Sequence, residues 1–180
     1  NCSISGSLNG REGRADDLGE ECRITFEPES GAVKVKAITV SKCKTYCGAA
    51  ATFDGLYKLP PSGCTEQNQK SRRNNFLKLY RAHDFTKASD ELENLLEQCA
   101  AGFMGQLEID KVRNDLALAQ YHRGDSAACL RTLSATQAAR YANEEQLSEE
   151  LSPSDFDDYI TIAKATWHNL SLCEKDTKAK

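Results

Sequence analysis

Eight cysteines spread along the whole chain constrain the fold more than any other feature of this sequence. They occupy positions 2, 22, 43, 47, 64, 99, 129 and 173. An even number of widely spaced cysteines is typical of disulfide bonds formed in an oxidising compartment. A structural zinc site groups its ligands in short pairs, and only Cys43 and Cys47 lie that close in sequence. We therefore expect disulfides, no metal site, and a protein of the periplasm or one that is secreted.

The charge and hydropathy of the chain argue against two classes of partner. The net charge of −4 and the pI near 5.5 do not favour nucleic-acid binding, which usually needs a basic face. No apolar run reaches the roughly 18 residues that a membrane span requires, so no membrane insertion is expected. Because the chain opens abruptly at Asn1 and Cys2, we expect that a signal peptide has been removed.

Residues 1–64 have the two-residue period of β-strands. Segments 22–26 and 33–37 alternate apolar and polar side chains, and a Glu-Pro-Glu-Ser-Gly stretch lies between them. This pattern predicts a hairpin with one buried face. Residues 9 and 10 (Asn-Gly) predict a turn, residues 11–20 an exposed loop, and residues 49–57 a further strand. The expected N-terminal domain, 1–64, is a small disulfide-bonded antiparallel β module.

From Thr65 onward the apolar residues recur at three- and four-residue steps, which predicts helices. Two helical hairpins are expected, with turns at His83-Asp84 and Gly124-Asp125. A last helix begins at Ser152-Pro153-Ser154-Asp155, where serine is suited to the N-cap and proline to the first helical position. The expected fold is α+β: the β module, then an antiparallel array of about five helices in a domain spanning residues 65–180.

The two hairpins show a weak internal repeat when His83 is aligned with Gly124. The segment 114–133 resembles a tetratricopeptide hairpin, with a glycine at the turn and a small residue five places later. The closing proline and the early large aromatic of that family are missing, and the spacing is longer than its repeat of about 34 residues. The resemblance implies stacked helical hairpins without a regular superhelix.

The expected helices suggest how the cysteines pair. In an antiparallel hairpin the start of one helix meets the end of the next, which favours bridges Cys64–Cys99 and Cys129–Cys173. The four N-terminal cysteines allow three pairings. Of these we favour Cys22–Cys43 with Cys2–Cys47.

Two further motifs resemble a group of exported proteobacterial proteins. One runs from Tyr46 to Tyr57 and is followed by Pro-Pro and a cysteine; the other comprises residues 113–125 and Ala-Ala-Cys-Leu at 127–130. The resemblance extends over residues 22–173, implies a periplasmic location and carries over no catalytic residue. Small cysteine-rich β modules of that compartment also include inhibitors of lysozyme-type hydrolases.

The sequence offers little for catalysis, so we expect neither an enzyme nor a cofactor. Paired cysteines supply no thiolate, and the familiar hydrolase, zinc-protease and phosphate-loop motifs are missing. His83 and His122 are interpreted as turn residues, and His168 as partly buried packing beside a tryptophan. The acidic segment 144–158 is interpreted as a solvated linker and a helix start. The glycosylation patterns at Asn1 and Asn169 are interpreted as coincidence.

The leading functional hypothesis is a periplasmic protein that binds another protein, as an inhibitor or immunity protein acting on a cell-wall hydrolase or a delivered toxin. The alternative is an adaptor whose helices hold a peptide or envelope component. The candidate partner-binding residues are Tyr46, Phe53, Asp54 and Tyr57, because exposed aromatics on a disulfide-bonded loop make good anchors. An equally acceptable interpretation is that these aromatics pack the β module onto the helices. The oligomeric state is not indicated.

Overall fold

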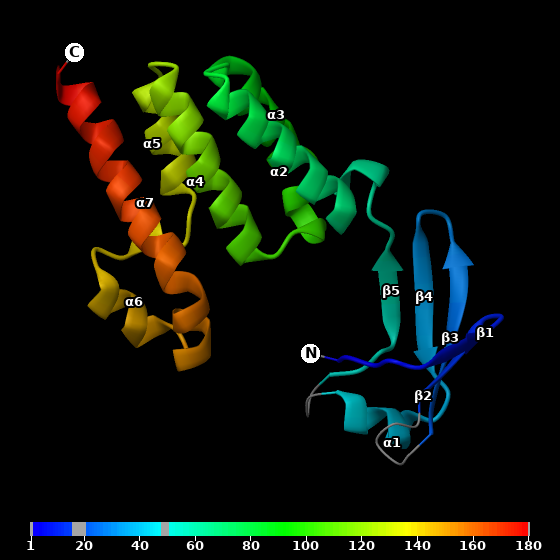
Figure 1. The fold of residues 1–180 in the computed structure, drawn as a ribbon. Coiled ribbons are helices and arrows are strands. Elements are labelled where there is room, and N and C mark those ends of the chain that lie inside the picture. Colours follow the sequence, from blue (N-terminus) through cyan, green and yellow to red (C-terminus); the bar gives the residue numbers. More distant parts are fainter. Residues whose placement is uncertain (1, 16–20, 48–50, 180) are drawn as a thin grey trace. The chain divides into compact units, whose positions relative to one another are not determined.

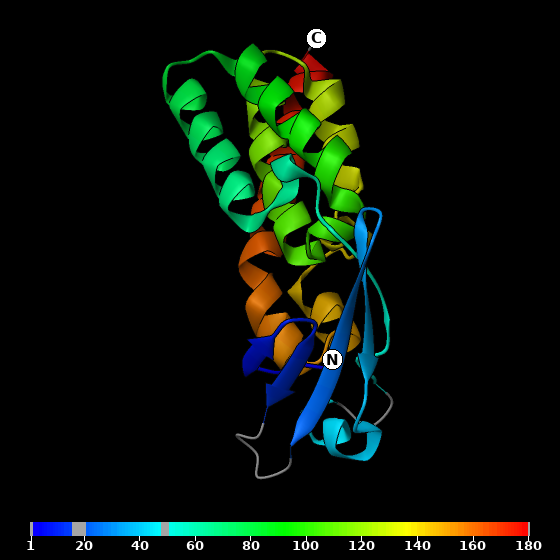
Figure 2. The same cartoon turned by 90° about the vertical axis from the view of Figure 1, so that its right-hand side faces the viewer.

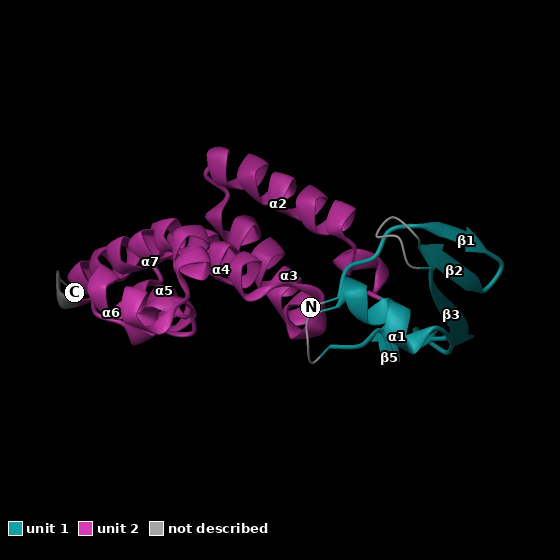
Figure 3. Cartoon of the chain, turned by 90° about the horizontal axis from the view of Figure 1, so that it is seen from below, with its two compact units in different colours: residues 1–59 teal, residues 60–180 magenta. Residues whose placement is uncertain are grey.

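A computed structural model of the chain describes residues 2–15, 21–47 and 51–179. Its contacts divide the chain into two units, residues 1–59 and residues 60–180 (Figure 3). The division lies slightly before the boundary expected at residue 64, and Cys64 belongs to the second unit, where it is bonded to Cys99. The fold is α+β: a disulfide-bonded antiparallel sheet precedes a set of helical hairpins.

The first unit, called the β unit below, is a five-stranded antiparallel sheet in which consecutive strands are neighbours (Figure 1). Its strands are β1 (Ser7–Asn9), β2 (Glu12–Ala15), β3 (Cys22–Glu29), β4 (Ala32–Ala37) and β5 (Gly55–Lys58). The hairpin expected from alternation is β3–β4, which turns at Gly31 with a φ of 70°. Glycine suits this turn because side chains with a Cβ rarely adopt positive φ.

Residues 12–15 form β2, where a loop was expected. Gly13 pairs with Ile24, and a Cβ at position 13 would lie 2.9 Å from the ring of Phe26. The glycine therefore lets the Phe26 side chain cover β2, which a pattern based on polarity alone does not reveal. Strand β5 begins at Gly55, later than expected, and residues 48–50 of the expected strand lie outside the described residues.

Two disulfides close the β unit. Helix α1 (Val40–Cys43) and a 3₁₀ turn at Lys44–Tyr46 connect β4 to the segment before β5. The Cys22–Cys43 bond ties α1 to β3, and the Cys2–Cys47 bond ties the N-terminal segment to the end of the 3₁₀ turn. These are the pairings that the sequence favoured among the three possible.

The second unit, called the helical unit below, contains two antiparallel hairpins and a long final helix (Figure 2). Its helices are α2 (Glu66–Arg81), α3 (Phe85–Phe103), α4 (Gln106–His122), α5 (Ser126–Ser134), α6 (Glu144–Glu150) and α7 (Pro153–Ala179). Five of these match the expected helices, and α6 is an additional short one. Among the described residues, no helix combines the length and apolar character that crossing a membrane requires.

The turns of the two hairpins have the same backbone geometry, which supports the internal repeat. His83 has a φ of 60° and Gly124 a φ of 86°, and the amide of each donates to the carbonyl three residues earlier. Asp84 and Asp125 then cap the following helices, accepting from the amides of Lys87 and Ala128. Each turn thus ends one helix with a left-handed residue and begins the next with an aspartate cap.

The equivalent turns respond differently to alanine. Gly124→Ala is expected to lower the free energy of unfolding by about 1–2 kcal/mol, because it adds a Cβ in the left-handed region. His83→Ala is the matched control and should change it by less than about 0.5 kcal/mol, since position 83 already carries a Cβ. Urea unfolding followed by circular dichroism measures both. Equal losses in the two variants would contradict the shared geometry.

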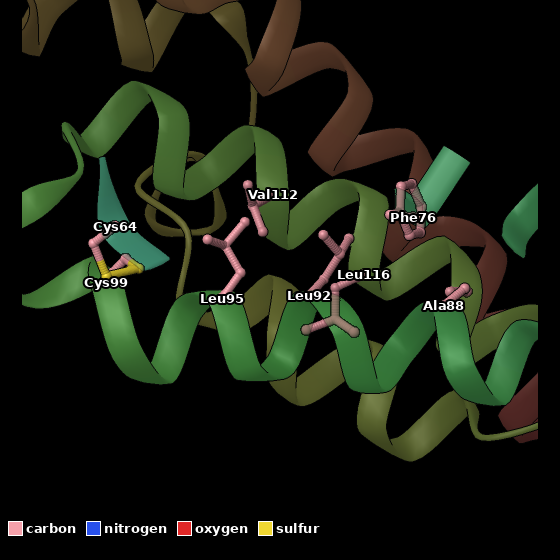
Figure 4. Close-up of a cluster of buried hydrophobic side chains, with 9 residues drawn as sticks. Cys64, Phe76, Ala88, Leu92, Leu95, Cys99, Val112 and Leu116 are labelled. Atoms are coloured by element: carbon pink, nitrogen blue, oxygen red, sulfur yellow. A yellow bond between two sulfur atoms is a disulfide. The ribbon is translucent and has the colours of Figure 1, made fainter. Parts of the chain in front are cut away.

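An apolar core joins the first hairpin to α4. Figure 4 shows Leu92 and Leu95 of α3 directed toward Val112 and Leu116 of α4, with Phe76 of α2 at one end. A fully buried leucine contributes about 1.5–3 kcal/mol relative to an exposed one. At the other end of the same core lies the Cys64–Cys99 bond, which holds the start of α2 against α3.

Polar side chains hold α7 against α4 in the interior. The carboxylate of Asp110, on α4, is fully buried and accepts from the Tyr159 hydroxyl at 2.7 Å and the Gln137 amide at 2.9 Å. Farther along, Asn114 donates to Thr166 at 2.9 Å and accepts from Asn169 at 3.0 Å. The Cys129–Cys173 bond, also expected from the sequence, joins α5 to α7. The C-terminal helix is therefore fixed by paired buried polar groups as well as by a covalent bond.

Candidate functional site

The four residues proposed as partner contacts differ in exposure. Tyr46 is 8% exposed and Phe53 is 7% exposed, and both lie in the core of the β unit with Ile24 and Val35. The expectation that they are exposed anchors is wrong. The 3₁₀ turn and the segment before β5 fold over the apolar face of the sheet, so their aromatic side chains point inward. Their partners belong to the β unit itself.

Asp54 is exposed but has a structural role. One carboxylate oxygen accepts a hydrogen bond from the Ala37 amide at 2.6 Å. Strand β5 pairs with β4 only as far as the Val35–Gly55 pair. If β5 were longer, one of its carbonyl groups would accept from the Ala37 amide of β4. The Asp54 carboxylate takes the place of that carbonyl.

Tyr57 is the one proposed aromatic contact that is exposed, at 48% of its surface. Its hydroxyl donates to the Phe53 carbonyl at 3.0 Å, and its ring lies over Gly55. This hydrogen bond fixes the ring at the edge of the sheet. The exposed ring borders an open hollow in the β unit.

That hollow, called the β5 groove below, is an open apolar depression of about 910 Å³. It is lined by residues 2–4, 24, 26, 33, 35, 51–53 and 57–59. The apolar face of the sheet is covered at one end by Tyr46 and Cys43, whereas Phe26 and Val33 toward the β3–β4 turn are only partly buried. The groove lies at the end of this face that Tyr46 and Cys43 do not cover.

Sequence reasoning identified Phe53 and Tyr57 of this groove but missed Phe26, Val33 and Leu59. Leu59 is 54% exposed and directly precedes Pro60 and Pro61. The alternation of β3 and β4 assigned Phe26 and Val33 to the buried face. Only the position of the covering segment shows that they remain accessible.

The opposite face of the sheet is polar. The Arg23 guanidinium donates to the Glu12 carboxylate at 2.7 Å, and Arg14 donates to the same carboxylate oxygen at 3.1 Å. The hydrogen bond from Arg23 is the main cause that holds the pKa of the Glu12 carboxyl below its usual range. On this face, near β2 and β3, charges of opposite sign are thus paired.

A second hollow lies in the helical unit between α2 and α4, with a volume of about 570 Å³. Its apolar part includes Leu77 and Met104, and Arg73 lies at its side. The Arg73 guanidinium reaches the carboxylates of Glu108, at 3.2 Å, and Asp115, at 2.8 Å. Its charge is already balanced by these two acids.

The histidines are placed at helix ends and on the surface. His83 and His122 lie at the hairpin turns, and each is in contact with the ring of Phe85. His168 is exposed, contrary to the expectation of partial burial, whereas the indole of the neighbouring Trp167 donates to the carbonyls of Ala138 and Tyr141. Among the described residues, no group of three or more His, Cys, Asp or Glu side chains is arranged to hold a metal ion.

The acidic segment contains a helix where a linker was expected. Helix α6 is capped by Asn143, whose side chain accepts from the Gln146 amide, and it buries Leu147. Glu144 pairs with Lys164 at 2.8 Å. Asn169 is 4% exposed and hydrogen-bonded, so the folded helical unit leaves no room for a glycan on its side chain, and Asn1 lies outside the described residues.

Comparisons of the chain with protein-family models, with curated proteins and with solved structures found no match. The candidate site therefore stands on its own geometry: an open apolar groove beside the last strand of a disulfide-bonded sheet.

Proposed function

We propose that this chain is a protein-binding protein that acts outside the cytoplasm, and that the β unit holds an extended segment of its partner in the β5 groove. The observation that carries the proposal is the combination of an open apolar groove with an edge strand, β5. An edge strand offers unpaired backbone groups, and adjacent pockets select side chains, which is a common way to bind an extended peptide.

The disulfides support the location. All eight cysteines are paired in four bonds, a number typical of proteins in oxidising compartments. Two of these bonds lie in the β unit, where they hold both the N-terminal segment and α1 against the sheet. A surface fixed in this way loses little conformational entropy when a partner binds, which favours affinity.

The partner class that we propose is a cell-wall hydrolase or a delivered toxin, and the chain would act as its inhibitor or immunity protein in the periplasm. An extended loop at the mouth of an enzyme cleft has the conformation that the β5 groove accommodates. Held in the groove, that loop is no longer free to admit the enzyme's own substrate. The chain then inhibits by occupancy and needs no chemistry of its own.

A variant of the groove tests this function. Leu59→Asp places a carboxylate at an exposed position of the groove, so the fold should be retained while binding weakens at least tenfold. Leu8→Asp is the matched control, since Leu8 is equally apolar and exposed but lies on β1, at the other edge of the sheet. The measurement is inhibition of peptidoglycan hydrolysis by a panel of lysozyme-type hydrolases and cell-wall-degrading toxins, with affinities determined for any enzyme inhibited.

The expected pattern is inhibition by the unmodified chain and by Leu8→Asp, with loss of inhibition in Leu59→Asp. If Leu59→Asp inhibits as well as the unmodified chain, the β5 groove is not the binding site. If no hydrolase is affected, partners isolated from periplasmic extract are compared using the same two variants. Identical capture by both would contradict the proposal.

The alternative is an adaptor whose helical unit holds a peptide, and one observation favours it. Leu77 is 40% exposed at the hollow between α2 and α4, where an apolar side chain of a ligand could be buried. Leu77→Asp therefore serves as a third arm of the same experiment. Loss of binding in Leu77→Asp, with binding retained in Leu59→Asp, would assign the function to the helical unit.

A further inference from the structure

Within the described sheet, β5 directs the backbone groups of alternate residues away from β4. The Leu59 amide donates to the Gly31 carbonyl at 2.9 Å, and Tyr57 pairs with Val33 two residues earlier. In an antiparallel ladder, residues two apart direct their backbone groups toward the same neighbouring strand. The peptide groups of Leu56 and Lys58 therefore point away from β4, to the open side of the last strand in the described sheet.

Hollows flank β5 on both faces of the sheet. The β5 groove lies on the apolar face, beside Tyr57. A smaller hollow of about 340 Å³ lies beside Leu56 and is bordered by Lys34 and Lys36 and by the acids Glu29 and Asp54. Side chains of a strand alternate between the two faces. A strand added to β5 can therefore place one set of side chains in the apolar groove and the other set near the lysines.

The charged side chain of β5 itself, Lys58, is positive. Lys34 pairs with Glu27 at 3.8 Å. Among the described residues, no carboxylate lies within 4 Å of the ammonium groups of Lys36 and Lys58. Lys58 is on β5 itself and directly neighbours an added strand. Glu27 and Glu29 are on β3, and Glu29 also borders the hollow beside Leu56. The Asp54 carboxylate is already bonded to the Ala37 amide.

We infer that the partner segment joins β5 as a sixth strand, with apolar side chains in the β5 groove and an acidic side chain opposite Lys58. The inference rests on the proposed function and specifies the chemistry of the partner. Opposite charges facing each other across a strand pair are favourable, whereas like charges are unfavourable. A second copy that paired its own β5 with Lys58 opposite Lys58 would bring like charges together, which is unfavourable in that register.

Capped peptides of alternating residues test the inference on the full chain. The probes are a dye-labelled Val-Glu repeat of seven residues and its Val-Lys counterpart, with affinities measured by fluorescence anisotropy at low ionic strength. The acidic peptide is expected to bind at least tenfold more tightly than the basic one. Lys58→Glu should reverse this preference, and the exposed Lys42→Glu on α1 is the control that should preserve it.

Backbone pairing is tested separately. Only alternate amides of an added strand face β5. Of two acidic peptides, one N-methylated at the valines and the other at the glutamates, one should therefore lose binding and the other should keep it. Amide hydrogen exchange should slow at Leu56 and Lys58 when the peptide binds. Exchange at Tyr57 and Leu59 should be slow with or without it.

The outcomes separate the inference from the function on which it rests. If the acidic and basic peptides bind equally and Leu59→Asp abolishes the binding of both, the acidic preference is overturned. The proposed function of the groove is then left in place. Binding that neither methylated set disturbs overturns strand addition. A dimer that the acidic peptide fails to dissociate assigns β5 to a second copy and overturns the inference. Should no peptide bind and Leu59→Asp leave partner binding unchanged, inference and proposed function fail together.

Discussion

Replacing Asp110 by alanine is expected to lower the free energy of unfolding by about 3–5 kcal/mol, because it leaves several buried donors without their acceptor and removes the acid paired with the half-buried Arg113 guanidinium. The Asp110 carboxylate accepts from Tyr159, Gln137, Gln106 and Arg113, all at 2.7 to 3.0 Å. The Tyr159 hydroxyl in turn accepts from the Ala138 amide. One side chain thus joins α4 to α7 and to the segment between α5 and α6.

Urea unfolding of the intact, oxidised chain measures this loss. Asp90→Ala is the matched control: Asp90 is an exposed aspartate on α3, and its replacement should change the free energy of unfolding by less than about 0.5 kcal/mol. Asp110→Asn, which keeps the size and one acceptor oxygen, should fall between the two. A loss below about 1 kcal/mol in Asp110→Ala would show that the network does not hold α7.

Replacing both Cys129 and Cys173 by alanine is expected to lower the free energy of unfolding by about 3–4 kcal/mol. The bond joins residues separated by 44 positions. Cross-linking restricts the unfolded chain by an amount that grows slowly with loop length, which gives this magnitude. The same unfolding measurement applies, followed at a wavelength that reports helix.

A control for the double cysteine variant measures how much a non-covalent contact between the same two helices, α5 and α7, contributes to stability. The Ser126 hydroxyl donates to the Asp176 carboxylate, also joining α5 to α7. Ser126→Ala removes this contact but leaves the disulfide, and it should cost about 1 kcal/mol. Similar losses in the two variants would mean that the disulfide adds little beyond the contact between the helices.

Local rules account for the parts of the fold that were predicted. The β3–β4 hairpin follows from alternation about a Pro and Gly turn, and the helices follow from three- and four-residue steps. The helical disulfides follow from helix direction, since antiparallel helices bring the start of one to the end of the other. These features depend on residues close in sequence or on the order of elements alone.

Long-range placement accounts for the parts that were missed. Tyr46 and Phe53 lie in a short segment without a period, so only the sheet beneath decides that they point inward. Helix α6 has the single buried apolar residue Leu147, and one residue defines no period. Asp110 is a buried aspartate on an amphipathic helix. The residues adjacent to it in the sequence do not distinguish it from a solvent-exposed aspartate.

The candidate site was anticipated in its region and in two of its residues, Phe53 and Tyr57. The segment up to Tyr57 was identified from its aromatics and cysteines, and Tyr57 does border the β5 groove. The groove itself results from incomplete cover of the sheet. A sequence pattern identifies the apolar face of a sheet. It does not indicate which part of that face other segments leave uncovered.

The bond between Cys2 and Cys47 has a practical consequence for any binding assay. Residues 2–4 line the β5 groove and are held there by that bond. An affinity tag or fluorophore fused ahead of Cys2 therefore emerges beside the groove and competes with incoming ligands. Reporter groups should therefore not be attached ahead of Cys2.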